Sequence, residues 1–529
     1  MSFSKKENLL FLIIICTLAG LITYIQYTKW IFDSPHRGDS AFLLEVTENI
    51  AKQNTTKSYD FGAFYHFNFG NIQSKTADIL CTQELNRFSD EAIDVMRNHS
   101  YYVLYIIAQL ARVIDTKLLF YCLHVTSFFV LLYFTYRIMR ESDVPIIASV
   151  LFLLLVFIHP AFSISISGQF YVERFFLAFA MMFLYLMHEK KSNLALLYIV
   201  SFFICLLTER APMYIGIFLT MYILLFWKSI ESNKRWHLIF LTTILLSYTV
   251  FALNNIKTLM GNQISTYLPT TATELISRLS NAMFLENLYV FLLCSFIFLG
   301  IFTFVHWKYL VMLTVMLVPN IIGNIGGAEK YGYFTHYHTL YFPFAVFLSV
   351  LGYIKIVTYL KTNTHRSLAA LVMIGLICFS SLYSPYNRKL AFINVINENV
   401  LFKDFHLYKE LFNQHSSTRQ YLNDFEKMNE IIPPGAVVSS FEIIIANLWK
   451  DRIHYMFPLG LDQADYVVMQ VVKENDEYKY SGFTSYVLTP SQIRAVDNCM
   501  IERMKKIGYD FQHQVIINGY AIIKRERNE

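Results

Sequence analysis

The stretch LLFLIIICTLAGLITYIQY, residues 9–27, is an almost unbroken apolar run. An α-helix that crosses a membrane needs about 20 mostly apolar residues, so this run is long enough to span a bilayer. It lacks a small-residue cleavage site and exceeds a signal-peptide core, so we expect a retained transmembrane helix. The stretch SPHRGDSAFLLEVTENIAKQ, residues 34–53, follows shortly afterwards and has the pattern of an amphipathic helix near the membrane surface.

The composition extends this interpretation to most of the chain. Of 529 residues, 55% are hydrophobic and only 16% are charged, which is too apolar for a soluble domain of this length. The formal net charge of +5 comes from residues near membrane crossings. We therefore interpret the charge as a topology signal, and we expect membrane lipids and no nucleic acid among the partners.

Apolar runs predict about eleven transmembrane helices and a mainly α-helical, multi-pass membrane protein. The qualifying runs are 8–27, 118–136, 144–160, 171–188, 194–208, 211–227, 236–254, 284–305, 308–323, 339–359 and 367–383. The run YYVLYIIAQLARV, residues 101–113, is too short to cross, and we expect it to lie half in the bilayer or along the interface.

Lysines and arginines in the short loops predict the orientation. With a cytoplasmic N-terminus, the inner loops carry Lys5, Lys6, Arg137, Arg140, Lys190, Lys191, Lys228, Lys234, Arg235, Lys308, Lys355, Lys361 and Arg366. The outer short loops carry only Arg174, Arg210, Lys257, Arg278 and Lys330. An odd number of crossings then puts the long loop 28–100 and the C-terminal tail on the outer side.

The tail has strand and turn signals that the first 383 residues lack. Residues 431–440, 454–458 and 465–472 have strand patterns, residues 490–507 a helical one, and Asn518-Gly519 is a strong hairpin signal. We expect a membrane domain over 1–383, a helical connector over 384–425 and a small extramembrane α/β domain over 426–529.

Two of the seven cysteines, Cys81 and Cys499, lie outside the apolar runs. A disulfide between them is one alternative, which requires that both face an oxidising compartment. Sequence alone does not decide the pairing.

Polar residues that interrupt the apolar runs fall largely on the predicted outer side, where charge near hydrocarbon usually faces a cavity or a partner. They are Asp39, His99, Glu173, Arg174, Glu209, Arg210, and, in the loop before a late crossing, Tyr333, His336, Tyr337 and His338. Taken singly, the Glu-Arg pairs could be structural ion pairs, the histidines interfacial aromatics, and Glu45 and Glu48 a solvated helix face. Taken together, five separate segments favour one shared site.

Asp39, Glu173, His336 and His338 are acceptable ligands for a divalent metal, which the pattern allows without specifying it. The chain has no phosphate-binding Walker loop, no GxGxxG fingerprint and no GxSxG elbow. These absences count against a nucleotide-driven pump, a dinucleotide enzyme and an α/β-hydrolase.

The order of these features resembles a bacterial family of uncharacterised membrane proteins that is similar to the GT-C superfamily of polyprenyl-phosphate-sugar-dependent glycosyltransferases. The segments that carry the resemblance are GDSAFLLEVTEN (38–49), NHSYYVLYIIAQLARVID (98–115), GQFYVERFF (168–176), LLTERAPMYIG (206–216) and HYHTLYFPFAVFLSVLGY (336–353). His99 departs from the family pattern, because Ser-Tyr-Tyr follows it in place of Phe-Ser-Pro.

The resemblance implies a GT-C-like fold in the bacterial inner membrane, with the tail periplasmic or extracellular. It implies transfer of a sugar from a polyprenyl-phosphate donor to an acceptor that the sequence does not identify. Asp39 and Glu173 are then the expected catalytic residues, with Asp39 as general base. The expected substrate-binding residues are His99, Arg174, Glu209, Arg210, Tyr333, His336, Tyr337 and His338.

Two other functions remain open at this point. A transporter or flippase of a lipid-linked sugar would be expected to carry polar groups near mid-membrane and repeat symmetry, and the apolar runs are poor in ionisable residues. A noncatalytic membrane scaffold would act through its outer tail.

Overall fold

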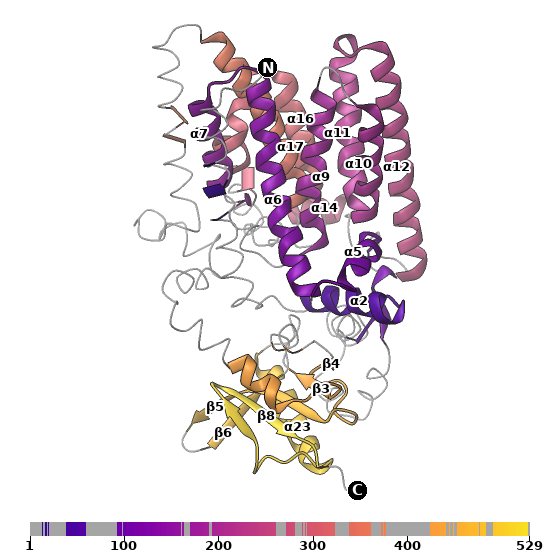
Figure 1. Cartoon of the computed structure of the whole chain (residues 1–529), viewed down its shortest axis with the longest axis vertical. Helices are drawn as coiled ribbons and strands as arrows, with labels where there is room; N and C mark the ends of the chain where they lie inside the picture. Colours follow the sequence, from indigo (N-terminus) through magenta and orange to yellow (C-terminus); the bar gives the residue numbers. More distant parts are fainter. Residues whose placement is uncertain are drawn as a thin grey trace. The chain divides into compact units, whose positions relative to one another are not determined.

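The computed structural model describes residues 39–59, 92–97, 99–159, 161–162, 170–189, 193–260, 271–280, 291–292, 294–322, 338–360, 424–440, 452–474, 477–482 and 490–526, with a few isolated positions (Figure 1). The chain forms two compact units. The first comprises Met1–Tyr27, Asn98–Val103 and Phe120–Asn413, and the second comprises Thr28–Arg97, Leu104–Leu119 and Gln414–Glu529.

The first unit is a bundle of apolar helices. Its elements are α6 (Thr116–Glu141, in this unit from Phe120), α7 (Ile146–Ile158), η4 (Val172–Arg174), α9 (Phe175–His188), α10 (Leu194–Leu207), α11 (Arg210–Phe226), η5 (Trp227–Ser229), α12 (Ser232–Met260), α14 (Ala272–Leu279), η6 (Cys294–Leu299), η7 (Gly300–Val305), α16 (Trp307–Ile322) and α17 (His338–Tyr359).

Four helical segments in the described part of the chain are long and apolar enough to cross a membrane: Thr116–Glu141, Arg210–Ser229, Ser232–Ile256 and His338–Tyr359. The prediction of about eleven crossings is not supported. The runs 144–160, 194–208 and 308–323 form helices of 13, 14 and 16 residues, and most of 8–27 and 367–383 lies outside the described residues. These helices match the predicted runs to within two residues at each end, and each is shorter than the roughly 20 residues that a crossing needs.

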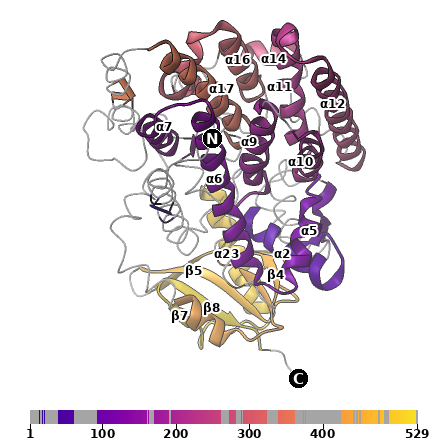
Figure 2. The same cartoon turned by 45° about the horizontal axis from the view of Figure 1, so that its top comes forward.

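Helix α17 forms the core of this bundle. It packs against α9, α11 and α16 (Figure 2), and nearly all its side chains from His338 to Val350 are buried. Gly352 allows a close approach, because a Cβ at this position would lie 2.0 Å from the carbonyl oxygen of Phe302. Any larger residue there would force α17 and η7 apart.

Short connections make consecutive helices antiparallel, so residues distant in sequence meet at two ends of the bundle. One end, which we call the basic end, gathers Arg137, Lys234, Lys308 and Lys355. Lys234 donates to the carbonyl oxygens of Met187 and Glu189 at 2.6 and 3.2 Å, and Arg137 donates to the Tyr185 hydroxyl at 3.0 Å. The predicted inner-loop basic residues in the described range therefore share one end, as the positive-inside pattern requires.

The second unit contains the amphipathic helix expected after the first apolar run. Helix α2 (Asp39–Gln53) begins at Asp39 and buries Phe42, Leu43, Val46 and Ile50. Glu45 and Glu48 are half-buried, and both have partners: Glu45 accepts from the Ser58 hydroxyl at 2.5 Å and Glu48 from the Thr116 hydroxyl. The interpretation of these two as a solvated face is therefore wrong.

Further elements of this unit are β1 (Lys57–Ser58), β2 (Ile93–Asp94), η3 (Val95–Arg97) and α5 (Val103–Ala111, in this unit from Leu104). Strands β1 and β2 pair antiparallel. Helix α5 has only 9 residues and exposes Tyr105, Ile106 and Leu110. A helix of this length is too short to cross a bilayer, as predicted for residues 101–113, and its position along the interface stays a prediction.

The C-terminal part of the second unit is a sheet with the order β4-β3-β5-β8-β7, and β6 extends it beside β5. Its elements are β3 (Val437–Ser440), β4 (Ile453–Met456), β5 (Tyr466–Glu474), β6 (Glu477–Ser481), α23 (Pro490–Lys506), β7 (Val515–Ile517) and β8 (Tyr520–Lys524). Strands β4, β3 and β5 are parallel, and β8 runs antiparallel to β5.

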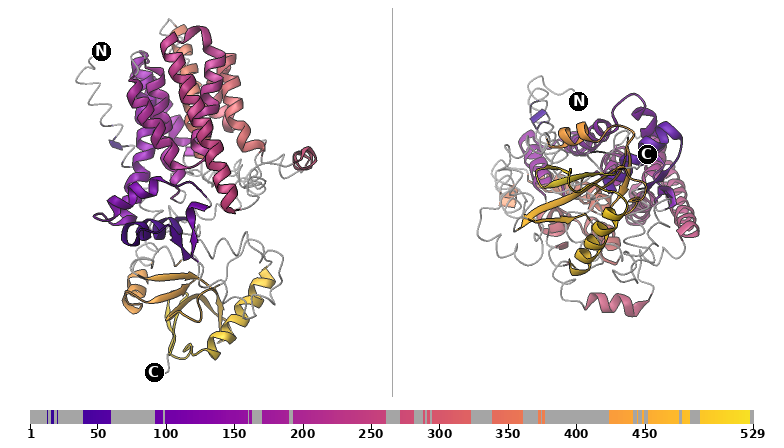
Figure 3. Two further views of the ribbon diagram at one scale, coloured as in Figure 1. Left: turned by 90° about the vertical axis from the view of Figure 1, so that its right-hand side faces the viewer. Right: turned by 90° about the horizontal axis from the view of Figure 1, so that it is seen from below.

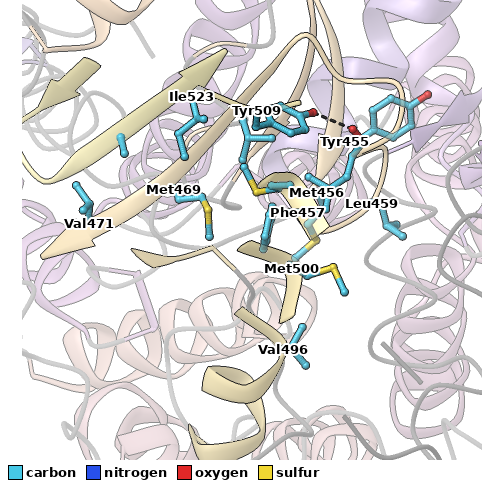
Figure 4. Packing of buried hydrophobic residues seen from close by; sticks show 14 residues of the cluster. Tyr455, Met456, Phe457, Leu459, Met469, Val471, Val496, Met500, Tyr509 and Ile523 are labelled. Atoms are coloured by element: carbon cyan, nitrogen blue, oxygen red, sulfur yellow. Dashed lines mark hydrogen bonds between the residues drawn. The ribbon is translucent and has the colours of Figure 1, made fainter. Parts of the chain in front are cut away.

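Alternation along the strands divides the core of the sheet between its two faces. Val467 and Met469 of β5 pack in one cluster with Val496 and Met500 of α23, whereas Val468 belongs to a second cluster. Figure 4 shows Met469, Val496 and Met500 of the first cluster, and Figure 3 gives two further views of the ribbon. In the first cluster the Tyr509 hydroxyl donates to the carbonyl oxygens of Leu461 and Ala464 at 2.8 and 2.9 Å.

Two local predictions for the tail are confirmed, and one is partly resolved. Asn518 and Gly519 have φ of 47° and 86° and form the turn between β7 and β8. The helix expected over 490–507 is α23. Cys499 in α23 is disulfide-bonded, while Cys81 lies outside the described residues.

Candidate functional site

The opposite end of the helix bundle, which we call the carboxylate end, holds Glu173, Glu209 and the start of α17. Helices α10 and α11 are joined by Thr208 and Glu209 alone, so both residues lie at this end. The turn η4 places Glu173 and Arg174 directly before α9. All described site residues of the first unit that the sequence predicted are at this end: His99, Glu173, Arg174, Glu209, Arg210 and His338.

Glu209 is completely buried and both of its carboxylate oxygens are engaged. His99 Nδ1 lies 3.0 Å from Oε1, while Oε2 accepts the Ser100 backbone N–H at 3.2 Å and the Thr208 hydroxyl at 3.0 Å. Burial alone would raise the pKa of Glu209, but His99, Arg210 and the hydrogen bonds outweigh it and lower the pKa to about 2. Glu209 is therefore ionised and holds the segment that carries His99.

Glu173 makes the corresponding contacts to Arg210 and Tyr101. Its Oε1 atom accepts from Arg210 Nη2 at 2.8 Å and from the Tyr101 hydroxyl at 3.0 Å. Arg210 Nε also lies 3.7 Å from Glu209 Oε1, so one guanidinium faces both carboxylates. We call the five residues His99, Tyr101, Glu173, Glu209 and Arg210 the carboxylate cluster.

The two carboxylates of this cluster are less exposed than His99 and Arg210. The side chains of Glu173 and Glu209 are 0% exposed, whereas those of His99 and Arg210 are 14% and 11% exposed. A solute that reaches the cluster therefore meets His99 and Arg210 before the carboxylates. A guanidinium that is already oriented can donate two parallel N–H groups to the oxygens of an anion.

The other predicted residues are less closely tied to the cluster. The Arg174 guanidinium lies 5.7 Å from the centroid of the Tyr171 ring, a cation–π distance. His338 is buried at the first position of α17, with Nδ1 3.1 Å from the Tyr341 hydroxyl and its ring 5.8 Å from that of Phe291. Tyr333, His336 and Tyr337 lie outside the described residues, and so does the side chain of Asp39.

Sequence reasoning missed two contributors at this end. Tyr101 was assigned to the interfacial segment, although it follows His99 by two residues and donates to Glu173. The Tyr214 hydroxyl donates to Asn320 Oδ1 at 2.8 Å, which joins α11 to α16. An asparagine inside an apolar run was the signal that could have indicated this contact.

A resident metal has no direct support from the contacts. Among the residues that the structure describes, no group of three or more histidine, cysteine, aspartate or glutamate side chains could hold a metal ion. Of the four ligands considered from the sequence, Glu173 instead binds Arg210 and Tyr101.

Comparison with known proteins does not indicate a function, so the function is inferred from this site. No protein-family model matches the chain, and no curated protein matches it significantly.

Proposed function

We propose that the protein is a membrane glycosyltransferase that transfers a sugar from a polyprenyl-phosphate donor to an acceptor at the outer face of the membrane. The observation that carries the proposal is the carboxylate cluster, in which two buried carboxylates orient His99 and Arg210 at one end of a bundle of apolar helices. The compartment follows from the predicted topology, in which the basic end is cytoplasmic.

The cluster suits the phosphate of a lipid-linked donor. The polyprenyl chain holds that phosphate in the headgroup layer, which is the depth at which membrane helices end. Arginine binds phosphate oxygens through two parallel N–H groups, and charge-assisted bonds of this kind are about twice as strong as neutral ones. Arg210 and His99 would bind the phosphate and stabilise the negative charge that develops on it as the sugar leaves.

The contacts change the expected role of Glu173. Because Glu173 already accepts from Arg210 and Tyr101, and Glu209 contacts His99, we assign Glu173 and Glu209 to positioning of Arg210 and His99. Asp39 remains our proposed general base. It would take the proton of the acceptor hydroxyl as that oxygen attacks the anomeric carbon, and the carbon–oxygen bond to the phosphate would break with its electron pair on the phosphate.

Donor turnover by the purified protein in lipid tests this proposal. We would incubate it with a panel of radiolabelled polyprenyl-phosphate sugars, with and without a divalent cation, and compare wild type with Arg210→Lys and Asp39→Asn. Arg210→Lys keeps the charge but loses the paired N–H groups, so we expect turnover to fall at least 10-fold. Arg137→Lys at the basic end is the matched control and should retain turnover.

Three other outcomes would change the proposal. Donor binding without turnover, together with passage of the donor across liposomes, would replace the transferase by a flippase. Equal turnover in Arg210→Lys and wild type would exclude the carboxylate cluster from the chemistry. Full turnover in Asp39→Asn would exclude only the general-base role of that residue.

A further inference from the structure

The basic end carries a group of rings and cations that the proposed function does not use. It consists of Phe226 at the end of α11, His306, Lys308 and Tyr309 at the start of α16, and Lys355 near the end of α17. We call these five residues the Lys308–Lys355 cluster. Three separate segments contribute to it.

The three rings of the cluster contact one another. Their centroids are 4.9 Å apart for His306 and Tyr309, 6.0 Å for Phe226 and Tyr309, and 6.2 Å for Phe226 and His306. Lys308 Nζ lies 4.7 Å from the Phe226 centroid and Lys355 Nζ 5.2 Å from that of Tyr309. Both ammonium groups are therefore placed by aromatic faces, a contact worth about 1 kcal/mol at partly exposed sites.

The two lysines give the cluster positive charge, and no acidic residue in the described part of the chain pairs with them. Burial lowers the pKa of His306, and the charges of Lys355 and Lys308 lower it further, so all three groups share one neighbourhood. Among the described residues, neither lysine forms an ion pair with a carboxylate; Lys308 donates instead to the carbonyl oxygen of Leu225. Two ammonium groups held together in this way favour an anion from outside the protein.

The position of the cluster indicates which anion that is. The residues lie where α11, α16 and α17 end, next to Trp307 and Tyr359, whose side chains are 61% and 76% exposed. Exposed aromatic residues at helix ends are typical of the headgroup layer of a bilayer. The phosphate of a phospholipid is the anion that is concentrated at this depth.

We infer that the Lys308–Lys355 cluster binds the phosphate of an anionic phospholipid at the membrane face opposite the carboxylate cluster. Lys308 and Lys355 would contact the phosphate oxygens, and Trp307 and Tyr359 would lie beside the acyl chains and glycerol. The site retains lipid at the basic end and is independent of the sugar-transfer proposal.

Native mass spectrometry of the full-length protein, released from detergent micelles with added lipid, tests this inference. We would titrate phosphatidylglycerol against phosphatidylcholine, and measure separately whether glycerol 3-phosphate or inorganic phosphate displaces the bound lipid. The variants are Lys355→Gln and Lys355→Arg. Lys228→Gln is the matched control, because Lys228 is an exposed lysine in η5 at the same end.

We expect a saturable phosphatidylglycerol adduct that phosphatidylcholine does not form. Lys355→Gln should weaken it about fivefold, the effect of one lysine at a membrane surface, while Lys355→Arg and Lys228→Gln retain it. Equal weakening by Lys228→Gln would overturn the inference in favour of a general surface potential. Unchanged binding in Lys355→Gln would also overturn it, as would full displacement by inorganic phosphate at comparable concentration.

Discussion

The charged side chains at the two ends of the helix bundle have different kinds of partner. At the carboxylate end, Glu173 lies 2.8 Å from Arg210 and Glu209 lies 3.0 Å from His99. At the basic end, Lys308 and Lys355 rest on aromatic rings, and among the described residues they have no acidic partner. Internal pairing preorganises cations for a reacting phosphate, whereas unpaired cations favour a ligand that stays bound.

Removing one carboxylate should affect the two ends very differently. We expect Glu209→Gln to lower the free energy of unfolding by about 3 kcal/mol, because the amide removes a completely buried charge and one of the two acceptor oxygens that His99, Ser100 and Thr208 contact. Glu141→Gln at the basic end should cost about 1 kcal/mol or less, since the side chains of Arg137 and Glu141 are 35% and 36% exposed. Denaturant titration in mixed micelles measures both, and equal losses would contradict the contrast between the ends.

A matched pair of tyrosine substitutions sharpens the contrast. Tyr101→Phe removes a hydrogen bond to the buried Glu173, which also pairs with Arg210, and this should cost about 2 kcal/mol. Tyr309→Phe keeps the ring that contacts Lys355 and loses no hydrogen bond among the described residues, so we expect a change below about 0.5 kcal/mol. The same titration checks both variants. A larger loss in Tyr309→Phe would show that its hydroxyl has a partner that we have not assigned.

The carboxylate cluster shows how far sequence reasoning reaches in a membrane chain. Loop charges and helix counting were enough to put His99, Glu173, Glu209 and Arg210 on one side, because antiparallel helices with short connections share their ends. The partners were not predictable. Glu173 binds Arg210 of α11, and the neighbouring Arg174 points elsewhere because adjacent residues of a helical turn do not face each other.

The C-terminal tail and the predicted membrane crossings also show which features sequence reasoning predicts and which it misses. The turn at Asn518-Gly519 and the strand over 465–472 have local signals in the sequence, so both were predictable. Strand β6 was missed because its sequence, EYKYS, is polar and exposed at the edge of the sheet. The count of about eleven crossings is not supported in the described residues. The apolar runs located their helices closely, as α10 shows by ending at Leu207, but several of these helices are shorter than the roughly 20 residues that a crossing needs.

The disulfide at Cys499 allows a test of the side of the membrane that we predict for the tail. Cys499 in α23 is bonded, and disulfides persist mainly in oxidising compartments, so the proposed outer location of the tail requires that this disulfide be present in the native protein. Cys81 is the partner that the sequence suggests. Mass spectrometry of a non-reduced digest should recover a peptide that joins these two cysteines and that disappears on reduction. A Cys499 peptide linked to any other cysteine would contradict the pairing.

Lowering the pH should destabilise the basic end before the carboxylate end, and by less than the substitutions do. The pKa of His306 is lowered from 6.5 by burial and by Lys355 and Lys308, so its neutral form favours the fold and stability there falls as pH drops below 6.5. The pKa of Glu209 is lowered from 4.5 to about 2, so its contribution is lost only below 4.5. As the pH falls from 6.5 to 4.5, backbone hydrogen exchange, corrected for intrinsic rates, should accelerate around residues 300–312. Exchange around residues 205–215 should remain slow. Bound phosphatidylglycerol should reduce this acceleration, because a nearby phosphate favours protonated His306, and acceleration at both ends together would contradict the assignment.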